Sequence, residues 1–228
     1  MKLIFLNCWH SKLENELEKF VLERAPTTDI FLFQEANEPM QEICARIIPS
    51  YQKVLAKKLV NDKNEYYFQA TYVHPDFGVT ESKILSEGGL DFGLGIYTKI
   101  KKGNTDLHIC NFHGPANPIN KLDSSERLAQ SKRLIDFFKE LGGQKIIGGD
   151  FNLLPEAESV KMFKQNGFID LIEKYKISTT RNRLAWDKFE VHYYFSDFVF
   201  VSPDILVNDF SCPNLEISDH LPMILEIN

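Results

Sequence analysis

The stretch Ile147-Gly148-Gly149-Asp150-Phe151-Asn152 largely decides how this chain folds, because a buried strand runs straight into a carboxylate and an amide. The segment Lys145–Gly149 predicts a strand inside a sheet. Catalytic groups tend to lie at strand ends and in loops held by a rigid sheet. Asp-x-Asn after a strand is also an ordinary Asx-turn, which nearby Pro155 suits. The two interpretations are compatible, since a rigid turn also positions a catalytic side chain.

Other predicted strands are bordered by polar residues of the same kinds. Apolar runs end at Asn7, at Glu35 and at His113, and Ser218-Asp219-His220 stands before the last strand. Several strands that end in carboxylate, amide or imidazole are what a shared polar site requires. Each residue alone has a plainer explanation, such as a turn residue, an exposed acid or a histidine that bonds the backbone.

Periodicity and turn residues predict helices interleaved with many strands. One helix follows a capping box at Ser11-Lys12-Leu13-Glu14 and ends before Pro26, and a later one follows a capping box at Asp123-Ser124-Ser125-Glu126 and ends at Gly142-Gly143. Two more helices are predicted from Pro39 to Ile48 and from Glu156 to Gln165. The other predicted strands are Lys2–Leu6, Asp29–Phe33, Tyr51–Ala56, Glu65–Tyr72, Glu81–Leu85, Leu94–Tyr97, Leu107–Asn111, Phe198–Val201 and Met223–Ile227.

The whole chain is predicted to form one α/β domain over residues 1–228, because no linker, repeat or low-complexity run divides it. Helices among strands suit sheets that are covered by helices on their outer faces. Hydrophobic residues make up 43% and charged residues 25%, which is ordinary for a globular domain and excludes a disordered or fibrous chain.

The charge balance bears on the partner. Lys and Arg number 26 against 32 Asp and Glu, a formal net charge of −6, whereas a protein that holds nucleic acid by its phosphates usually has a strongly basic face. This argues against a tight, non-specific DNA binder but not against a small phosphorylated substrate.

The cysteines and the apolar runs bear on the compartment. The 4 cysteines are far apart and show no CxxC or zinc spacing, so reduced, buried thiols are expected. No stretch approaches the roughly 18 apolar residues of a membrane span, and the apolar run after Met1-Lys2 is too short for a signal peptide. A cytoplasmic location without a membrane span is therefore expected.

Six segments, in order, resemble the motifs of the endonuclease/exonuclease/phosphatase superfamily, which has the DNase I-like fold. Gly148–Asn152 closely matches its GDFN motif, and Ser218-Asp219-His220-Leu221-Pro222 resembles its closing motif. The remaining four segments are Leu3–Asn7, Leu32–Glu35, Asn111–Gly114 and Ser196–Ser202. Any one of them would be weak evidence, but in sequence they span residues 3 to 222, nearly the whole chain.

This resemblance implies a fold and a reaction. The fold would be a four-layer α/β sandwich, with two mixed sheets face to face, helices outside, and the active site at one end. The reaction would be divalent-metal-dependent hydrolysis of a phosphodiester or phosphomonoester by in-line attack of an activated water, without a covalent enzyme intermediate.

The resemblance also assigns roles near the metal. Glu35 would hold Mg²⁺ or Mn²⁺, hard cations that take oxygen ligands, with Asp219 beside it. Asn7 would offer its amide oxygen to the metal or its NH₂ to a carboxylate or phosphate. Asp150 would orient or deprotonate the attacking water, and Asn152 would fix Asp150 or the phosphate.

On the phosphate side, His220 paired with Asp197 would donate hydrogen bonds as negative charge builds in the transition state. His113 is expected to be a second donor. Arg181 either contacts the substrate or is an exposed loop arginine, and Trp9 either lines the pocket mouth or belongs to the core. The other histidines match no motif and are expected to be structural: His10, His74, His108 and His192.

Tyr194-Phe195-Ser196 departs from the superfamily pattern, in which an arginine and a branched apolar residue often precede the aspartate. The local support of Asp197 is therefore expected to differ. A nuclease, either an exonuclease or an abasic-site endonuclease, stays an alternative that the net charge disfavours. A catalytically inactive binding module is a second alternative, but such a module would be expected to have lost Glu35, Asp150 or His220, and all three are present.

Overall fold

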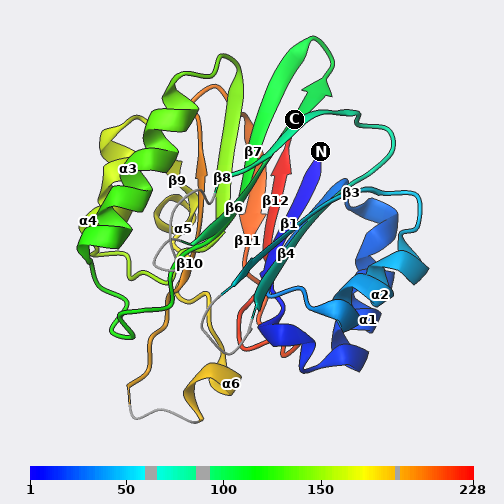
Figure 1. Cartoon of the computed structure of the whole chain (residues 1–228), viewed down its shortest axis with the longest axis horizontal. Coiled ribbons are helices and arrows are strands. Elements are labelled where there is room, and N and C mark those ends of the chain that lie inside the picture. The colour runs from blue at the N-terminus through cyan, green and yellow to red at the C-terminus, as the bar shows by residue number, and fades with distance from the viewer. Residues whose placement is uncertain (60–65, 86–92, 188–190) are drawn as a thin grey trace.

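Two six-stranded mixed sheets lie face to face in this computed structural model, which describes residues 1–59, 66–85, 93–187 and 191–228 (Figure 1). The predicted four-layer α/β sandwich is confirmed. Glu65, the first residue of the strand predicted over Glu65–Tyr72, lies outside the described residues.

The first sheet has the order β11-β12-β1-β2-β4-β3, in which only β1 and β2 run parallel. Its central pair carries the predicted Asn7 and Glu35 at one end, because Asn7 pairs in register with Gln34. The strands are β1 (Lys2–Asn7), β2 (Ile30–Gln34), β3 (Gln52–Leu59), β4 (Tyr66–Val73), β11 (Val207–Ser211) and β12 (Met223–Ile227).

The second sheet has the order β5-β6-β7-β8-β10-β9, with β7 and β8 parallel. The two sheets thus have the same plan, each with one parallel pair among antiparallel neighbours. The strands are β5 (Val79–Ile84), β6 (Leu94–Lys102), β7 (Thr105–His113), β8 (Gln144–Asp150), β9 (Ile169–Asp170) and β10 (Asp197–Val201).

Helices cover the outer face of each sheet. Figure 1 shows α1 (Glu14–Arg24) and α2 (Glu38–Ile47) against the first sheet, and α3 (Ser125–Lys139) and α4 (Glu158–Gln165) against the second. The short helices α5 (Leu171–Lys174) and α6 (Arg183–Trp186) and the 3-10 turns at Trp9–Ser11 and Ala25–Thr27 complete the described part of the chain.

Strand alternation explains the layers. Successive residues of a strand point to opposite faces of the sheet. In β1, Leu3 and Phe5 belong to the core between the sheets, whereas Ile4 and Leu6 belong to the core beneath α1 and α2. Both faces of the strand are buried, and its sequence is accordingly a continuous apolar run.

Both predicted capping boxes are wrong in detail. The helix α1 begins after Leu13 without a side-chain cap, since Ser11 lies in a left-handed turn with φ 61°. At α3 the capping residue is Ser124, whose side chain accepts from the backbone N–H of Arg127. Asp123 instead accepts from the backbone of Glu158 at 2.7 Å and so caps α4. Because Ser124 caps α3, the carboxylate of Asp123 just before it is free to cap α4.

Candidate active site

Three predicted site residues lie side by side across the second sheet. His113 at the end of β7 pairs in register with Asp150 at the end of β8, and Asp150 pairs with Asp197 at the start of β10. All three side chains are buried, with at most 2% of their surface exposed. Strand register alone therefore places the Asp150 carboxylate between the His113 imidazole on one side and the Asp197 carboxylate on the other. In this way the sheet brings together residues that are far apart in sequence.

The two glycines before Asp150 let the strand pass close to its neighbours. A Cβ on Gly148 would lie 2.7 Å from the ring of Phe5 in the opposite sheet. Gly149 has φ +135°, and a Cβ there would lie 2.1 Å from the backbone oxygen of Phe112. Only glycine meets both conditions at low cost. The glycine pair thus sets where Asp150 leaves the sheet.

Asp150 is the most heavily bonded carboxylate of the site. Its Oδ1 accepts from the backbone N–H of Asn152 at 2.9 Å and from the Ser196 hydroxyl at 2.6 Å. Its Oδ2 accepts from the Asn7 side chain at 2.9 Å and lies 3.7 Å from the Nε2 atoms of both His113 and His220. The first of these bonds is the Asx-turn predicted from the sequence, so the turn and the site coincide.

Burial alone would raise the pKa of the Asp150 carboxyl, but the nearby positive charges of His220, Lys121 and His113 outweigh it and hold that pKa well below its usual value. The ionised form of Asp150 is therefore favoured. A carboxylate of such low pKa is a weak base and a good hydrogen-bond acceptor.

Asn7 joins the two halves of the site. Its Nδ2 donates to Asp150 and to Glu35 Oε1, the latter at 3.2 Å, while its Oδ1 accepts from the backbone N–H of Trp9. Glu35 has φ 50°, a conformation that costs free energy outside glycine. Its other oxygen lies 3.1 Å from His10 Nε2, so the expectation that His10 is merely structural is wrong: it contacts a candidate metal ligand.

His220 and Asp197 form a buried pair. His220 Nδ1 lies 2.9 Å from both carboxylate oxygens of Asp197. Burial and the Arg181 guanidinium lower the pKa of the imidazole. The carboxylates of Asp197, Asp219 and Asp150 outweigh them, and the pKa is raised. The charged form of the ring is thereby favoured, and its Nε2 faces Asp150.

Arg181 also lies in the site rather than in an exposed loop. It forms an isolated β-bridge with His220, and its guanidinium bonds the Asp219 carboxylate at 2.7 Å. Both side chains are 12% exposed, so they border the opening of the site.

Oxygen donors suited to a divalent cation are present. Glu35 and Asp150 both lie within 3.2 Å of Asn7 Nδ2, and Mg²⁺ and Mn²⁺ take carboxylate and amide oxygens. Among the described residues, Asp150, Asp197 and His220 form a second group, whose ligand atoms lie within 4.8 Å of one another. A metal-bound histidine must be neutral, and His220 is held charged by Asp197. Of the two groups, we therefore favour the one that contains Glu35 as the candidate metal site.

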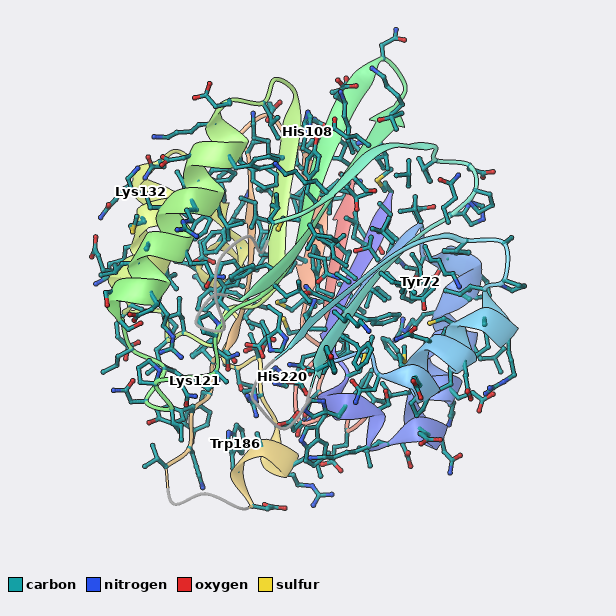
Figure 2. All side chains as sticks on the ribbon, viewed as in Figure 1. Tyr72, His108, Lys121, Lys132, Trp186 and His220 are labelled. Atoms are coloured by element: carbon teal, nitrogen blue, oxygen red, sulfur yellow. The ribbon has the colours of Figure 1, made fainter. Side chains whose placement is uncertain are left out.

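Two contributors are absent from the predicted set. Ser196 begins the family-like segment Ser196–Ser202 and was given no role in the site, yet its hydroxyl bonds Asp150. Lys121 is 9% exposed and bonds Asn152 and Ser196. No periodicity or motif marks Lys121, which Figure 2 labels in the same lower part of the molecule as His220.

Trp9 is half-buried rather than a core residue. Lys12 Nζ lies 4.2 Å from its ring centroid, and its backbone bonds Asn7. The remaining histidines lie elsewhere: His108 bonds the Tyr97 hydroxyl, His74 packs on Tyr51 and His192 stacks on Trp186.

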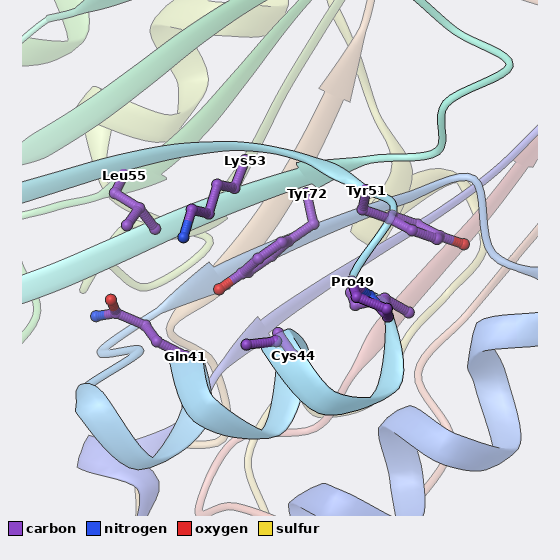
Figure 3. A pocket seen from close by; sticks show the side chains of 9 residues that line it. Gln41, Cys44, Pro49, Tyr51, Lys53, Leu55 and Tyr72 are labelled. Carbon is purple, nitrogen blue, oxygen red and sulfur yellow. The ribbon is translucent and has the colours of Figure 1, made fainter.

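A separate hollow of about 170 Å³ lies between α2 and strands β3 and β4 (Figure 3). None of the predicted site residues lines it. Its one thiol, Cys44, has a pKa raised by burial to about 12 and is unreactive at neutral pH. All 4 cysteines are free, as predicted. In the described ranges no helix has the length and apolar character that would let it span a membrane.

Two facing mixed sheets with carboxylates, amides and histidines gathered at one end have the architecture of the DNase I-like hydrolases. A model of the Endonuclease/Exonuclease/phosphatase family matches residues 4–220. The chain therefore belongs to this family, and the resemblance drawn from its six motifs is confirmed.

Solved structures agree on the fold. A Bacteroides vulgatus endonuclease/exonuclease/phosphatase has a TM-score of 0.79 at 17% identity, covering 100% of this chain and 98% of that one. The mannosyl-6-phosphatase Bt3783 of Bacteroides thetaiotaomicron has a TM-score of 0.75 at 20% identity, with 100% and 99% covered. The human Nocturnin catalytic domain, solved with a bound sulfate anion, has a TM-score of 0.75 at 17% identity, with 100% and 93% covered. No curated protein matches the chain significantly in sequence.

Proposed function

We propose that this protein is a divalent-metal-dependent phosphoesterase that hydrolyses a phosphomonoester or phosphodiester by in-line attack of water. The observation that carries the proposal is the row of His113, Asp150 and Asp197 across three adjacent strand ends, with His220 and Asn7 against it.

Charge balance supports a phosphate substrate. The site holds four carboxylates, Glu35, Asp150, Asp197 and Asp219, against three cations, Lys121, Arg181 and His220. The set alone repels an anion slightly, but one divalent cation makes it net positive. Glu35, with Asp219 as a second proposed ligand, would hold Mg²⁺ or Mn²⁺, which would supply electrostatic stabilisation of the phosphoryl and leaving oxygens. Asn7 donates its Nδ2 to the Glu35 and Asp150 carboxylates and so holds them in place.

The remaining steps belong to side chains of this chain. Asp150 accepts a hydrogen bond from the attacking water at Oδ2 and orients it, since its low pKa makes it a poor proton acceptor in the ground state. The bond from the water oxygen to phosphorus forms as the ester P–O bond breaks, and the electron pair of that bond departs with the ester oxygen. The forming bond makes the water acidic, so its proton passes by way of Asp150 Oδ2 to solvent, and the departing oxygen takes a proton from solvent. His220 donates from Nε2 to a phosphoryl oxygen, and the charged form of the ring matches the growing negative charge. His113 and Asn152 are proposed as further donors, and Arg181 as a substrate contact at the opening.

The net charge of −6 favours a small or lipid-derived phosphate ester over a nucleic acid. Two fold relatives support the same choice of probes, since one is by name a mannosyl-6-phosphatase and the other holds a sulfate anion. Preferential hydrolysis of nucleic acid would identify the protein as a nuclease instead.

The first experiment measures hydrolysis of p-nitrophenyl phosphate, bis-p-nitrophenyl phosphate, mannose 6-phosphate and labelled single- and double-stranded DNA, each with Mg²⁺ or EDTA. We expect turnover that requires metal and falls by roughly 10³-fold or more in Asp150→Asn. The matched control is Asp209→Asn, the same change at an exposed position on β11. Metal-independent turnover, or equal activity in Asp150→Asn, would refute the proposal, and a preference for DNA would establish the nuclease instead.

A second experiment tests the metal ligand. Glu35→Gln should raise the Mg²⁺ concentration for half-maximal activity and weaken Mn²⁺ binding in calorimetry, because an amide is a poorer ligand than a carboxylate. Glu38→Gln, an exposed neighbour at the start of α2, is the control. An unchanged metal titration in Glu35→Gln would remove Glu35 as a ligand.

A further inference from the structure

A buried lysine lies directly behind the catalytic carboxylate. Lys121, in the loop between β7 and α3, is 9% exposed, and its Nζ donates to Asn152 Oδ1 and to Ser196 Oγ, both at 2.8 Å. Each of these partners bonds Asp150 Oδ1, Asn152 through its backbone N–H and Ser196 through its hydroxyl. The ammonium and the carboxylate are therefore joined through two bridging groups.

A buried ammonium needs compensation, since removing a charge from water is costly. Burial lowers the pKa of Lys121, and Asp150 is the main group that raises it. Reciprocally, Lys121 is among the cations that hold the pKa of Asp150 down. The two charges support each other, although no salt bridge joins them directly.

The loop holds Lys121 in place. Its backbone has φ 55°, its N–H donates to Pro118 O at 3.3 Å, and its carbonyl accepts from the Leu154 N–H at 2.9 Å. The buried guanidinium of Arg127 donates to the carbonyls of Pro115 and Leu122 on either side. A left-handed backbone is unfavourable outside glycine, so the surrounding structure must hold Lys121 in this conformation.

Lysine fixes the direction of every bond in this chain of contacts because its ammonium only donates. Ser196 Oγ must accept from Lys121, so the Ser196 proton points at Asp150 Oδ1. Asn152 Oδ1 must likewise accept, so the Asn152 Nδ2 points the other way, where it bonds Gly114 O at 3.1 Å. A neutral residue at position 121 would remove the donor to both oxygens, so the hydroxyl would be held only by Asp150 and the amide only by Gly114.

We propose that Lys121 is a positioning residue for phosphate-ester hydrolysis, which orients Asp150 through the Ser196 hydroxyl and holds the Asn152 amide by a direct hydrogen bond. The proposal rests on the proposed function, because it assumes that Asp150 orients the attacking water. Lys121 itself contacts neither the water nor the phosphate. Its effect is expected on turnover rather than on substrate binding.

The kinetic test uses Lys121→Met, which keeps the length of the side chain and removes its charge and both bonds. We expect kcat to fall about 100-fold, as for a slightly misplaced catalytic group, while KM changes by less than about threefold. Lys132→Met is the matched control, since Lys132 is exposed on α3 (Figure 2). Ser196→Ala should lower kcat in the same way, and the double variant should be less impaired than the product of the two effects.

Chemical rescue separates positioning from general structural damage. In Lys121→Ala, ethylammonium should restore part of kcat, whereas tetramethylammonium at equal ionic strength should not, because it cannot donate a hydrogen bond. Absence of rescue together with a kcat near the wild-type value in Lys121→Met and Ser196→Ala would overturn the proposal.

A stability cycle gives a readout without turnover. Lys121→Met, Asp150→Asn and the double variant are compared by thermal unfolding. The effect of Lys121→Met on Tm should be smaller by at least about 2 °C in the Asp150→Asn background, because the charge it supports is gone. Additive changes would refute the coupling. If the wild-type protein shows no metal-dependent hydrolysis, the proposed function fails, and this cycle still decides whether Lys121 supports Asp150.

Discussion

Replacing Asp197 with asparagine tests whether the charge on His220 drives turnover. The substitution keeps the size of the side chain and removes its charge. Unit charges about 4 Å apart interact by about 4 kcal/mol at an effective dielectric constant near 20, and His220 Nδ1 lies 2.9 Å from both Asp197 oxygens. Removing the charge of Asp197 therefore lowers the pKa of the imidazole.

Two other carboxylates reduce this loss. Asp150 Oδ2 and Asp219 Oδ1 lie 3.7 and 3.8 Å from His220 Nε2 and continue to favour the charged ring. We therefore expect kcat near neutral pH to fall by about 10²- to 10³-fold, the range seen when one transition-state donor is lost.

The assay is kcat as a function of pH at saturating metal. The pKa of His220 is raised in the folded protein, so the charged ring persists above the usual histidine value and is lost as pH rises through the raised value. In Asp197→Asn the pKa drops, and activity should partly return as the pH is lowered. Asp209→Asn, exposed on β11, is the control.

Thermal unfolding checks the same pair independently of turnover. Because the pKa of His220 is higher in the folded protein than in the unfolded chain, protonation of its ring stabilises the fold. This stabilisation is complete below the pKa of the unfolded chain, near 6.5, and is lost as pH rises through the pKa of the folded protein. The wild-type protein should lose this increment of stability on the alkaline side, and Asp197→Asn should not. A variant with kcat within about threefold of the wild type and an unchanged pH profile would refute the reasoning.

Three further predictions concern stability and reactivity. Gly148→Ala should destabilise the protein by about 1–3 kcal/mol through overpacking against Phe5, seen as a lower Tm, whereas Gly78→Ala, with nothing within 4 Å of the added Cβ, should not. Arg127→Met should lower the free energy of unfolding in urea by about 2–4 kcal/mol, because buried loop carbonyls lose their donor; a change below 0.5 kcal/mol would contradict this. Iodoacetamide at pH 8 should leave Cys44 unmodified in the native protein, since its pKa is about 12, and label it after unfolding; rapid native labelling seen by mass spectrometry would contradict the burial.

The fold was predictable because its signals are local. Continuous apolar runs mark strands that are buried on both faces, as in β1 and β2. By contrast, β11 was not predicted: it is an edge strand of Val207–Ser211 in which Asn208 and Asp209 are exposed, so it carries little apolar signal. The helices α5 and α6 have four residues each and are too short to show a period.

Most predicted site residues stand at the end of an apolar run, and the change from apolar to polar residues shows in the sequence where such a strand ends. Lys121 carries no such signal. Its burial depends on a left-handed backbone and on bonds to residues 31 and 75 positions away. Lysine in a loop is normally solvated, so only the folded structure distinguishes Lys121 from an exposed lysine. His10 was missed for the same reason, because the left-handed turn after β1 brings it to Glu35.

The two halves of the site come from different sheets, so their spacing depends on how the sheets are joined. A buried amide layer does this directly behind the site. Asn111 of β7 accepts at Oδ1 from Gln34 of β2 at 2.6 Å and from Gln69 of β4 at 2.9 Å. Its Nδ2 donates back to the first sheet, to the carbonyls of Phe33 and Ala70. Apolar side chains pack without direction, whereas hydrogen bonds fix the offset of one sheet against the other. Because Gln34 immediately precedes Glu35 and Asn111 lies two residues before His113, the layer sets the distance between the metal side of the site and its phosphate side.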